Sequence, residues 1–166
     1  MGVQLQNDVL MHAEGLLPTL LQNPDAFGSL VYEFGAMRIE RLTRVIGQYD
    51  IFLNRYTRIT DEPRGMRSSG EPAFIERVLE GRLQVDIYKT RSSRRPVYLA
   101  TFVVGPDAWY TIRKGGRPVF LMETPVMLSV TVAEDAPVYD CPLLQPDVKT
   151  ELVECFRTHY PAPAST

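Results

Sequence analysis

The chain has 166 residues, of which 45% are hydrophobic and 23% are charged, and its formal net charge is −2. These values lie close to the averages of globular domains, so they exclude a disordered or fibrous chain. At this length, folding buries roughly 70% of the surface that the unfolded chain exposes. One domain, residues 1–166, can therefore form a core without disulfides or metals.

Targeting signals and cysteine motifs are missing from the sequence. No apolar run approaches the roughly 18 to 20 residues of a membrane helix, and the N-terminus lacks the basic flank and apolar stretch of a signal peptide. We therefore expect no membrane partner and no secretion through a signal peptide, which leaves the cytoplasm or a virion. Cys141 and Cys155 stand outside any Cys-x-x-Cys arrangement, so we expect reduced thiols.

Two helices are predicted in the helical N-terminal segment, residues 1–35. The first begins at Asn7 or Asp8, and Pro18 is expected to interrupt it because proline lacks an amide donor. The second begins at Asn23-Pro24-Asp25, with Asn23 as its N-cap. Its apolar side chains follow at i, i+3, i+4 and i+7, as Phe27, Leu30, Val31 and Phe34. Gly35 is expected to end this helix.

Residues 37–132 are predicted to form a β-rich core. Met37–Ile46 fits a helix or a strand, and its β-branched content favours the strand. Residues 49–60 are predicted to be extended, and residues 61–71 form a loop rich in Pro, Gly and Ser. Residues 72–80 then fit a short middle helix that Gly81 ends.

The clearest strand pattern begins at Leu83. Apolar Leu83, Val85 and Ile87 alternate with neighbours in the period of two that marks a half-buried strand. Its partner is Pro96–Val104, across a turn at residues 91–94. Because that partner is apolar on both faces, we expect a central strand covered on both sides.

The remaining segments complete an α+β fold. Trp109–Lys114 and Pro118–Met122 flank Gly115-Gly116, which predicts a hairpin, and Met127–Val132 predicts another strand. Pro146 opens a C-terminal helix, residues 146–160, and residues 161–166 form a tail. The expected architecture is a mainly antiparallel sheet of about five to seven strands with N-terminal helices, a short middle helix and a C-terminal helix.

Signatures of catalysis are missing from the sequence. Its two histidines, His12 and His159, lie at opposite ends, and no G-x-S-x-G, P-loop, G-x-G-x-x-G or H-E-x-x-H motif occurs. Glu76 and Glu80 would share one face of the predicted middle helix, where solvation is the simplest role. We therefore expect no catalytic residue, no metal and no cofactor.

Basic residues concentrate in the middle of the chain. Residues 37–117 contain 16 Lys and Arg against 9 Asp and Glu, whereas the two flanks contain 2 against 11. Most are Arg, whose planar fork pairs with carboxylate or phosphate. The candidates for binding a partner or an anion lie on three predicted turns and their flanks: Arg64, Arg67, Arg91, Arg94, Arg95, Arg113, Lys114 and Arg117. These turns could converge on one anion, or their charges could simply keep them solvated.

The hairpin from Leu83 to Pro106, with Arg95-Pro96-Val97-Tyr98-Leu99-Ala100 entering its second strand, resembles the substrate-covering hairpin of chorismate lyase-like domains. This resemblance implies a small-molecule enzyme or sensor that holds an anionic ligand over the sheet, through Arg82, Arg91 or Arg95. The family's catalytic Arg on the first strand has no clear counterpart, because that strand offers Asp86 and Lys89.

The missing catalytic signatures and the opposed charges of middle and flanks favour a non-catalytic structural or assembly subunit, such as one of a virus or phage particle. It would act through protein–protein contacts with other subunits, as a homo- or hetero-oligomer. Two alternatives remain open. One is the small-molecule enzyme or sensor, and the other is a nucleic-acid-binding module, whose affinity would fall steeply with salt.

Overall fold

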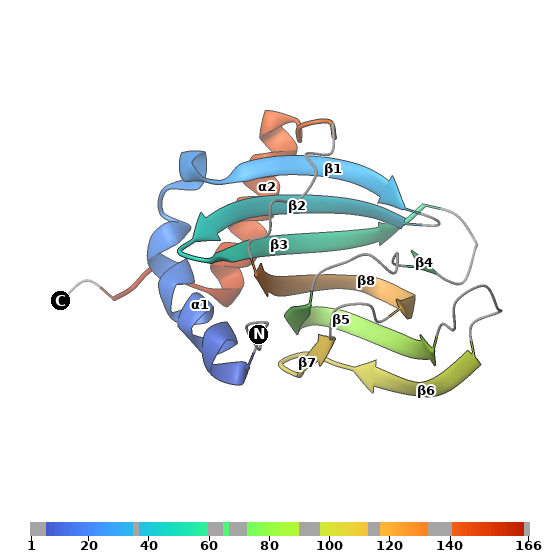
Figure 1. Ribbon diagram of the computed structural model, residues 1–166. Helices are drawn as coiled ribbons and strands as arrows, with labels where there is room; N and C mark the ends of the chain where they lie inside the picture. Colours follow the sequence, from blue (N-terminus) through green and yellow to red (C-terminus); the bar gives the residue numbers. More distant parts are fainter. Residues whose placement is uncertain are drawn as a thin grey trace.

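The computed structural model describes residues 6–34, 37–59, 65–66, 73–89, 97–112, 117–132 and 141–164. In these residues, eight antiparallel strands form one sheet, and a helix lies at each end of the chain (Figure 1). The predicted α+β class and mainly antiparallel sheet are confirmed. Among the described segments, no helix has the length and apolar character needed to cross a membrane.

The two longest strands, β5 and β8, pair with each other and organise the sheet. Strands run in the order β1-β2-β3-β8-β5-β6, while the short strands β4 and β7 pair with β8 and β5, respectively. The bounds are α1 Asn7–Leu20, the 3-10 turn η1 Pro24–Ala26, β1 Gly28–Phe34, β2 Met37–Ile46, β3 Tyr49–Arg58, β4 Gly65–Met66, β5 Phe74–Lys89, β6 Val97–Val104, β7 Trp109–Ile112, β8 Arg117–Val132 and α2 Pro146–His159.

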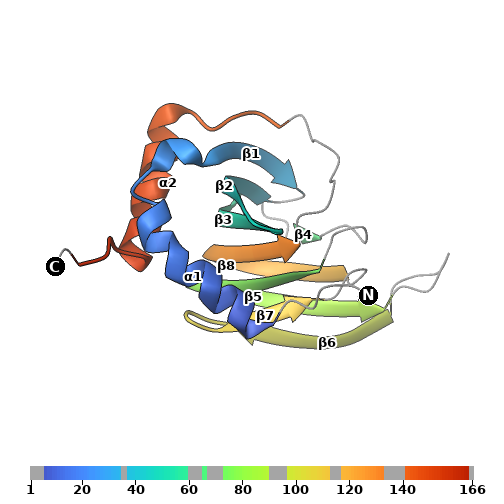
Figure 2. The ribbon, with the colours of Figure 1, turned by 60° about the vertical axis from the view of Figure 1, so that its left-hand side comes forward.

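Both helices pack on one face of the sheet, which we call the helix-covered face. Figure 2 shows α1 and α2 side by side against it. Fully buried side chains from both helices and four strands meet there: Leu10, Leu17, Leu42, Leu53, Ile75, Leu128, Leu152 and Phe156. Burying a Leu or Phe side chain stabilises a fold by roughly 1.5–3 kcal/mol, so this layer is the main core.

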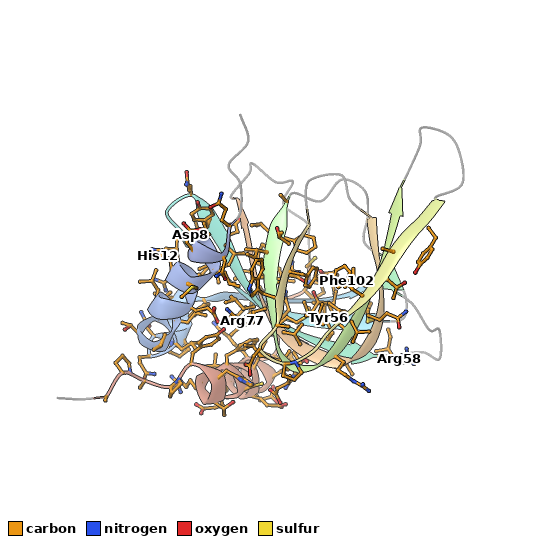
Figure 3. The ribbon with its side chains drawn as sticks, turned by 90° about the horizontal axis from the view of Figure 1, so that it is seen from below. Asp8, His12, Tyr56, Arg58, Arg77 and Phe102 are labelled. Atoms are coloured by element: carbon orange, nitrogen blue, oxygen red, sulfur yellow. The ribbon has the colours of Figure 1, made fainter. Side chains whose placement is uncertain are left out.

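The opposite face of the sheet carries a second cluster, rich in aromatic side chains, which we call the aromatic face. Its buried members are Met37, Ile39, Tyr56, Phe74, Val78, Leu83, Val85, Val104, Tyr110 and Met127, and Tyr32 and Phe102 pack against them. Figure 3 places Tyr56 and Phe102 among the strands, whereas Arg77 points toward the helices. Alternation along each strand sends neighbouring side chains to the two different clusters.

A polar network joins the helices to the sheet. Arg77 of β5 binds Glu14 of α1 with an Nη2–Oε1 distance of 2.9 Å, and it donates to the carbonyl of Asp107 at 2.5 Å. The Tyr160 hydroxyl, just past α2, donates to the second carboxylate oxygen of Glu14 at 2.6 Å. Three distant segments therefore meet at the Glu14 carboxylate, and Arg77 also ties the turn at Asp107 to them.

Burial raises the pKa of Tyr160 above its ordinary value, and the hydrogen bond to Glu14 adds to the effect. The folded state holds the Tyr160 proton more tightly than the unfolded state does. The contribution of this hydroxyl to the free energy of unfolding is therefore complete below the pKa of an unfolded tyrosine, about 10, and is lost as the pH rises further. We expect the stability difference between the wild type and Tyr160→Phe to shrink above about pH 10. Urea unfolding at a series of pH values measures this difference, and a constant value would contradict the assignment.

The predicted second helix over Phe27, Leu30, Val31 and Phe34 is wrong, because these residues form β1. Asn23 makes no side-chain capping bond, and only the short turn η1 follows it. Val31 packs on the helix-covered cluster while Tyr32 packs on the aromatic cluster. A strand buried on both faces thus produced spacings that also fit a helix.

The predicted short middle helix over residues 72–80 is also wrong, because Phe74 begins β5. Phe74 and Val78 enter the aromatic cluster, whereas Ile75 and Leu79 enter the helix-covered cluster. Gly81 does not end a helix. Its φ of 76° lies in an irregular stretch, where the pairing of β5 with β8 shifts register between Val78 and Arg82.

Other boundaries differ in smaller ways. Helix α1 continues through Pro18 to Leu20, with Leu17 and Leu21 both buried against the sheet. Strand β8 runs unbroken through residues 118–132, so the two strands predicted there are one. In the described residues, β7 pairs with β5 and not with β8. The strand reading of Met37–Ile46, the pairing of β5 with β6 and the C-terminal helix are confirmed.

Candidate functional site

The predicted basic turns cannot be placed together. Seven candidates lie outside the described residues: Arg64, Arg67, Arg91, Arg94, Arg95, Arg113 and Lys114. Arg117 begins β8 opposite Tyr88, and its side chain is also outside the described part. Convergence of these residues on one anion stays a prediction. Arg82 is exposed and neighbours buried Leu83, so strand alternation directs it away from the aromatic face.

Glu76 and Glu80 do not share a face. The Glu76 side chain is fully buried on the aromatic face, where the Tyr110 hydroxyl donates a hydrogen bond to it. Tyr110 in turn makes an edge contact with the Phe74 ring, with centroids 5.9 Å apart. Burying a carboxyl group is costly unless it is hydrogen-bonded, so we assign the Glu76–Tyr110 pair a structural role in the aromatic face.

Glu80 lies at the other side of the sheet, beside α2. Its Oε2 is 2.8 Å from His159 Nε2, and Cys155 donates to the same oxygen at 3.6 Å. The hydrogen bond from His159 lowers the pKa of Glu80. Burial, followed by the charge of Glu80, raises the pKa of Cys155 to about 11, so this thiol stays protonated near neutral pH and is a poor nucleophile. Within the described residues, no three His, Cys, Asp or Glu side chains are placed to hold a metal.

Arg41 of β2 lies on the aromatic face, where side chains of the neighbouring strands hold its guanidinium. Its Nε donates to Asn54 Oδ1 on β3 at 2.7 Å, and its Nη2 donates to the Tyr32 hydroxyl on β1 at 3.1 Å. Its guanidinium carbon also lies 4.4 Å from the centroid of the Phe52 ring and 5.3 Å from that of Tyr32. Three neighbouring strands therefore fix this guanidinium in one position.

Asn54 leaves part of this arrangement unsatisfied. The residue is fully buried, and its side-chain nitrogen Nδ2 has no hydrogen-bond partner. The orientation of the amide is clear because Arg41 can only donate, so the atom facing it must be the oxygen. A buried donor left without an acceptor costs about 1–3 kcal/mol, which makes this atom an unusual feature of the core.

Sequence reasoning missed Arg41 and Asn54, although a signal was present. Read as a strand, Met37–Ile46 places Arg41 on the same face as Met37 and Ile39. The same alternation in β3 places Asn54 beside Phe52 and Tyr56. A polar residue on an otherwise apolar strand face is more informative about function than a single apolar residue on the surface.

A second candidate region is the edge of the sheet at β6. The strand is last in the sheet order, so the prediction of a central strand is wrong, and among the described residues it pairs only with β5 (Figure 1). Its sequence from Val97 to Val104 has no charged residue, no Pro and no Gly. Tyr98 is 54% exposed and Val103 is 62% exposed.

The opposite edge of the sheet, at β1, is partly covered by another segment of the chain. The Val31 amide of β1 donates to the Pro142 carbonyl at 3.0 Å, so the segment before α2 lies along this edge. Natural proteins protect edge strands with charges, prolines, bulges or covering segments because an open edge pairs with other chains. Among the described residues, the only such feature at β6 is a register shift opposite Ile87 and Tyr88, which leaves residues 100–104 regular.

Comparisons with known proteins leave the family open. No family model and no curated protein matches the sequence. Among solved structures, hydroxypropylphosphonic acid epoxidase from S. wedmorenis is 15% identical, over 65% of this chain and 56% of that chain, with a TM-score of 0.46. Hydroquinone 1,2-dioxygenase from Sphingomonas sp. TTNP3 with 4-hydroxybenzoate bound is 15% identical, over 55% and 63%, with a TM-score of 0.43. The chain spans little more than half of the epoxidase, and likenesses this distant carry no argument about function.

Proposed function

We propose that the protein is a non-catalytic assembly subunit whose copies associate through the β6 edge. The observation that carries the proposal is the uncharged edge strand, whose regular part includes the exposed Val103. The backbone groups of an edge strand that face away from its neighbour are best satisfied by another strand. A second β6 is a suitable partner because it is equally free of charge.

A two-fold axis beside β6 would join the two sheets through antiparallel pairing of identical strands. Closed two-fold interfaces of this kind use the same surface on both subunits. Cross-strand pairs of β-branched and aromatic side chains contribute roughly 0.2–1 kcal/mol each, in addition to the backbone hydrogen bonds. The β6 sequence, Val-Tyr-Leu-Ala-Thr-Phe-Val-Val, supplies such side chains almost throughout.

The test is Val103→Lys, with sedimentation velocity as the measurement. We expect the wild type to sediment as a dimer or larger species and the variant as a monomer, because lysine on an edge strand opposes strand pairing. Because Val103 is exposed, the change should alter the free energy of unfolding by no more than about 0.5 kcal/mol.

Val45→Lys is the matched control. Val45 is 63% exposed, almost the same as Val103, but it lies in β2, opposite Asp50 of β3 and far along the sheet from β6. This variant should sediment like the wild type. A wild type that remains monomeric at high concentration would refute the proposal, as would equal effects of the two substitutions.

A further inference from the structure

We infer that the Arg41–Asn54 pair on the aromatic face is a binding site for the carboxylate of a small organic acid. The inference is independent of assembly through β6, because β1, β2 and β3 carry it and these strands lie at the far end of the sheet. Two separate observations support it: the unused donors of Arg41, and the buried Asn54 amide that lacks an acceptor.

Arg41 has donors to offer. Its Nε and one N–H of Nη2 are used by Asn54 and Tyr32, which leaves both N–H groups of Nη1 and one of Nη2. In the part of the chain that the structure describes, no carboxylate forms an ion pair with Arg41. The free donors form the two-pronged edge that binds both oxygens of a carboxylate at once.

Asn54 adds a second, buried hydrogen-bond donor beside the guanidinium of Arg41. Its Nδ2 belongs to the amide group whose oxygen already binds Arg41 Nε, so this donor lies close to the guanidinium. It is buried and lacks a protein acceptor. An anion bound by Arg41 can supply the missing acceptor, so binding would satisfy a group that folding leaves unsatisfied.

The surroundings define the kind of anion. One guanidinium and one neutral amide match a single negative charge better than the two charges of a phosphate. The rings of Tyr32 and Phe52 flank Arg41 and are only half-buried, so an apolar body attached to the carboxylate can contact them. These features indicate a monocarboxylic acid with an apolar body.

The experiment uses benzoate as the probe and benzamide as its neutral counterpart. In spectra of the nitrogen-15-labelled full chain, benzoate should shift the Asn54 side-chain amide signals and the Arg41 Nε–H signal along a saturable curve. Benzamide should bind about tenfold or more weakly, because it lacks the negative charge that strengthens hydrogen bonds from the Arg41 guanidinium. Inorganic phosphate should also bind more weakly than benzoate.

Three variants locate the site. Arg41→Gln should weaken benzoate binding about tenfold or more. Asn54→Asp should do the same while keeping the fold, because the new carboxylate would pair with Arg41 and would replace the unsatisfied donor by an acceptor. Arg44→Gln is the matched control, since Arg44 lies on the same strand but over Phe27 on the helix-covered face, and it should bind like the wild type.

Each contrary result would overturn the inference. These results are the absence of a saturable shift with benzoate, equal affinity for benzamide, tighter binding of phosphate, and unchanged binding in Arg41→Gln. Circular dichroism and thermal melting of each variant separate a lost site from a lost fold. Asn54→Asp keeps the inference testable if Arg41→Gln fails to fold.

Discussion

Phe156→Ala should destabilise the protein by about 3–5 kcal/mol, the largest effect of any single substitution considered for this fold. Phe156 of α2 is fully buried in the helix-covered cluster, together with Leu152 and Val153 of the same helix. Removing the ring loses its burial and leaves a cavity that the rigid sheet cannot fill by collapse. Because small domains are stable by only about 5–15 kcal/mol, this change approaches global unfolding.

Urea unfolding followed by circular dichroism measures the effect. Glu154→Ala is the matched control on the same helix, since Glu154 is exposed and, among the described residues, forms an ion pair only with Arg157, at 2.5 Å. An exposed ion pair contributes about 0–1 kcal/mol, so the control should lose little stability. If Phe156→Ala also lost less than about 1 kcal/mol, α2 would not be part of the main core.

The parts of the fold that sequence could predict are those where one physical signal dominated. Strict alternation from Leu83 onward predicted the β5–β6 pairing, and Pro146 with the following apolar stripe predicted α2. Residues 27–34 and 74–80 were misassigned because apolar side chains occur on both faces of β1 and β5. Period alone does not separate such a strand from a helix.

The position of a strand within a sheet is harder to predict from its own sequence. Apolar residues on both faces of β6 suggested a central strand, yet the strand ends the sheet. Burial on both faces and pairing on both edges are separate properties, and side-chain alternation reports only the first. The same uniform apolar character that misled the prediction is now the argument for an interface at that edge.

The candidate sites show a similar limit. Runs of arginine in turns attract attention, but Arg41 is one of three arginines in Met37–Ile46 and nothing in the sequence distinguishes it, while Asn54 stands between Leu53 and Arg55. Their importance depends on a register that pairs Arg41 with Asn54 across β2 and β3. Register is determined by the whole sheet, so this juxtaposition could not be read from either strand separately.

Arg77→Met should destabilise the protein by about 2–3 kcal/mol, somewhat less than the loss of a fully buried ion pair. The side chains of Arg77 and Glu14 are 19% and 18% exposed, so water still screens part of their interaction. Methionine keeps most of the packing volume, but of the described partners of the Glu14 carboxylate it leaves only the Tyr160 hydroxyl. The Asp107 carbonyl also loses its donor, in a turn where Asp107 itself has a φ of 69°.

A double-mutant cycle separates the ion pair from packing. Adding Glu14→Gln to Arg77→Met removes the unpaired charge, and the amide oxygen of glutamine can still accept from Tyr160. The double variant should therefore be more stable than the sum of the single effects predicts, by about 1 kcal/mol or more. Purely additive effects, within about 0.5 kcal/mol, would show that Arg77 acts through packing alone. Coupling of the expected size would instead identify Glu14 as the charge through which Arg77 connects α1 and Tyr160, just past α2, to strand β5.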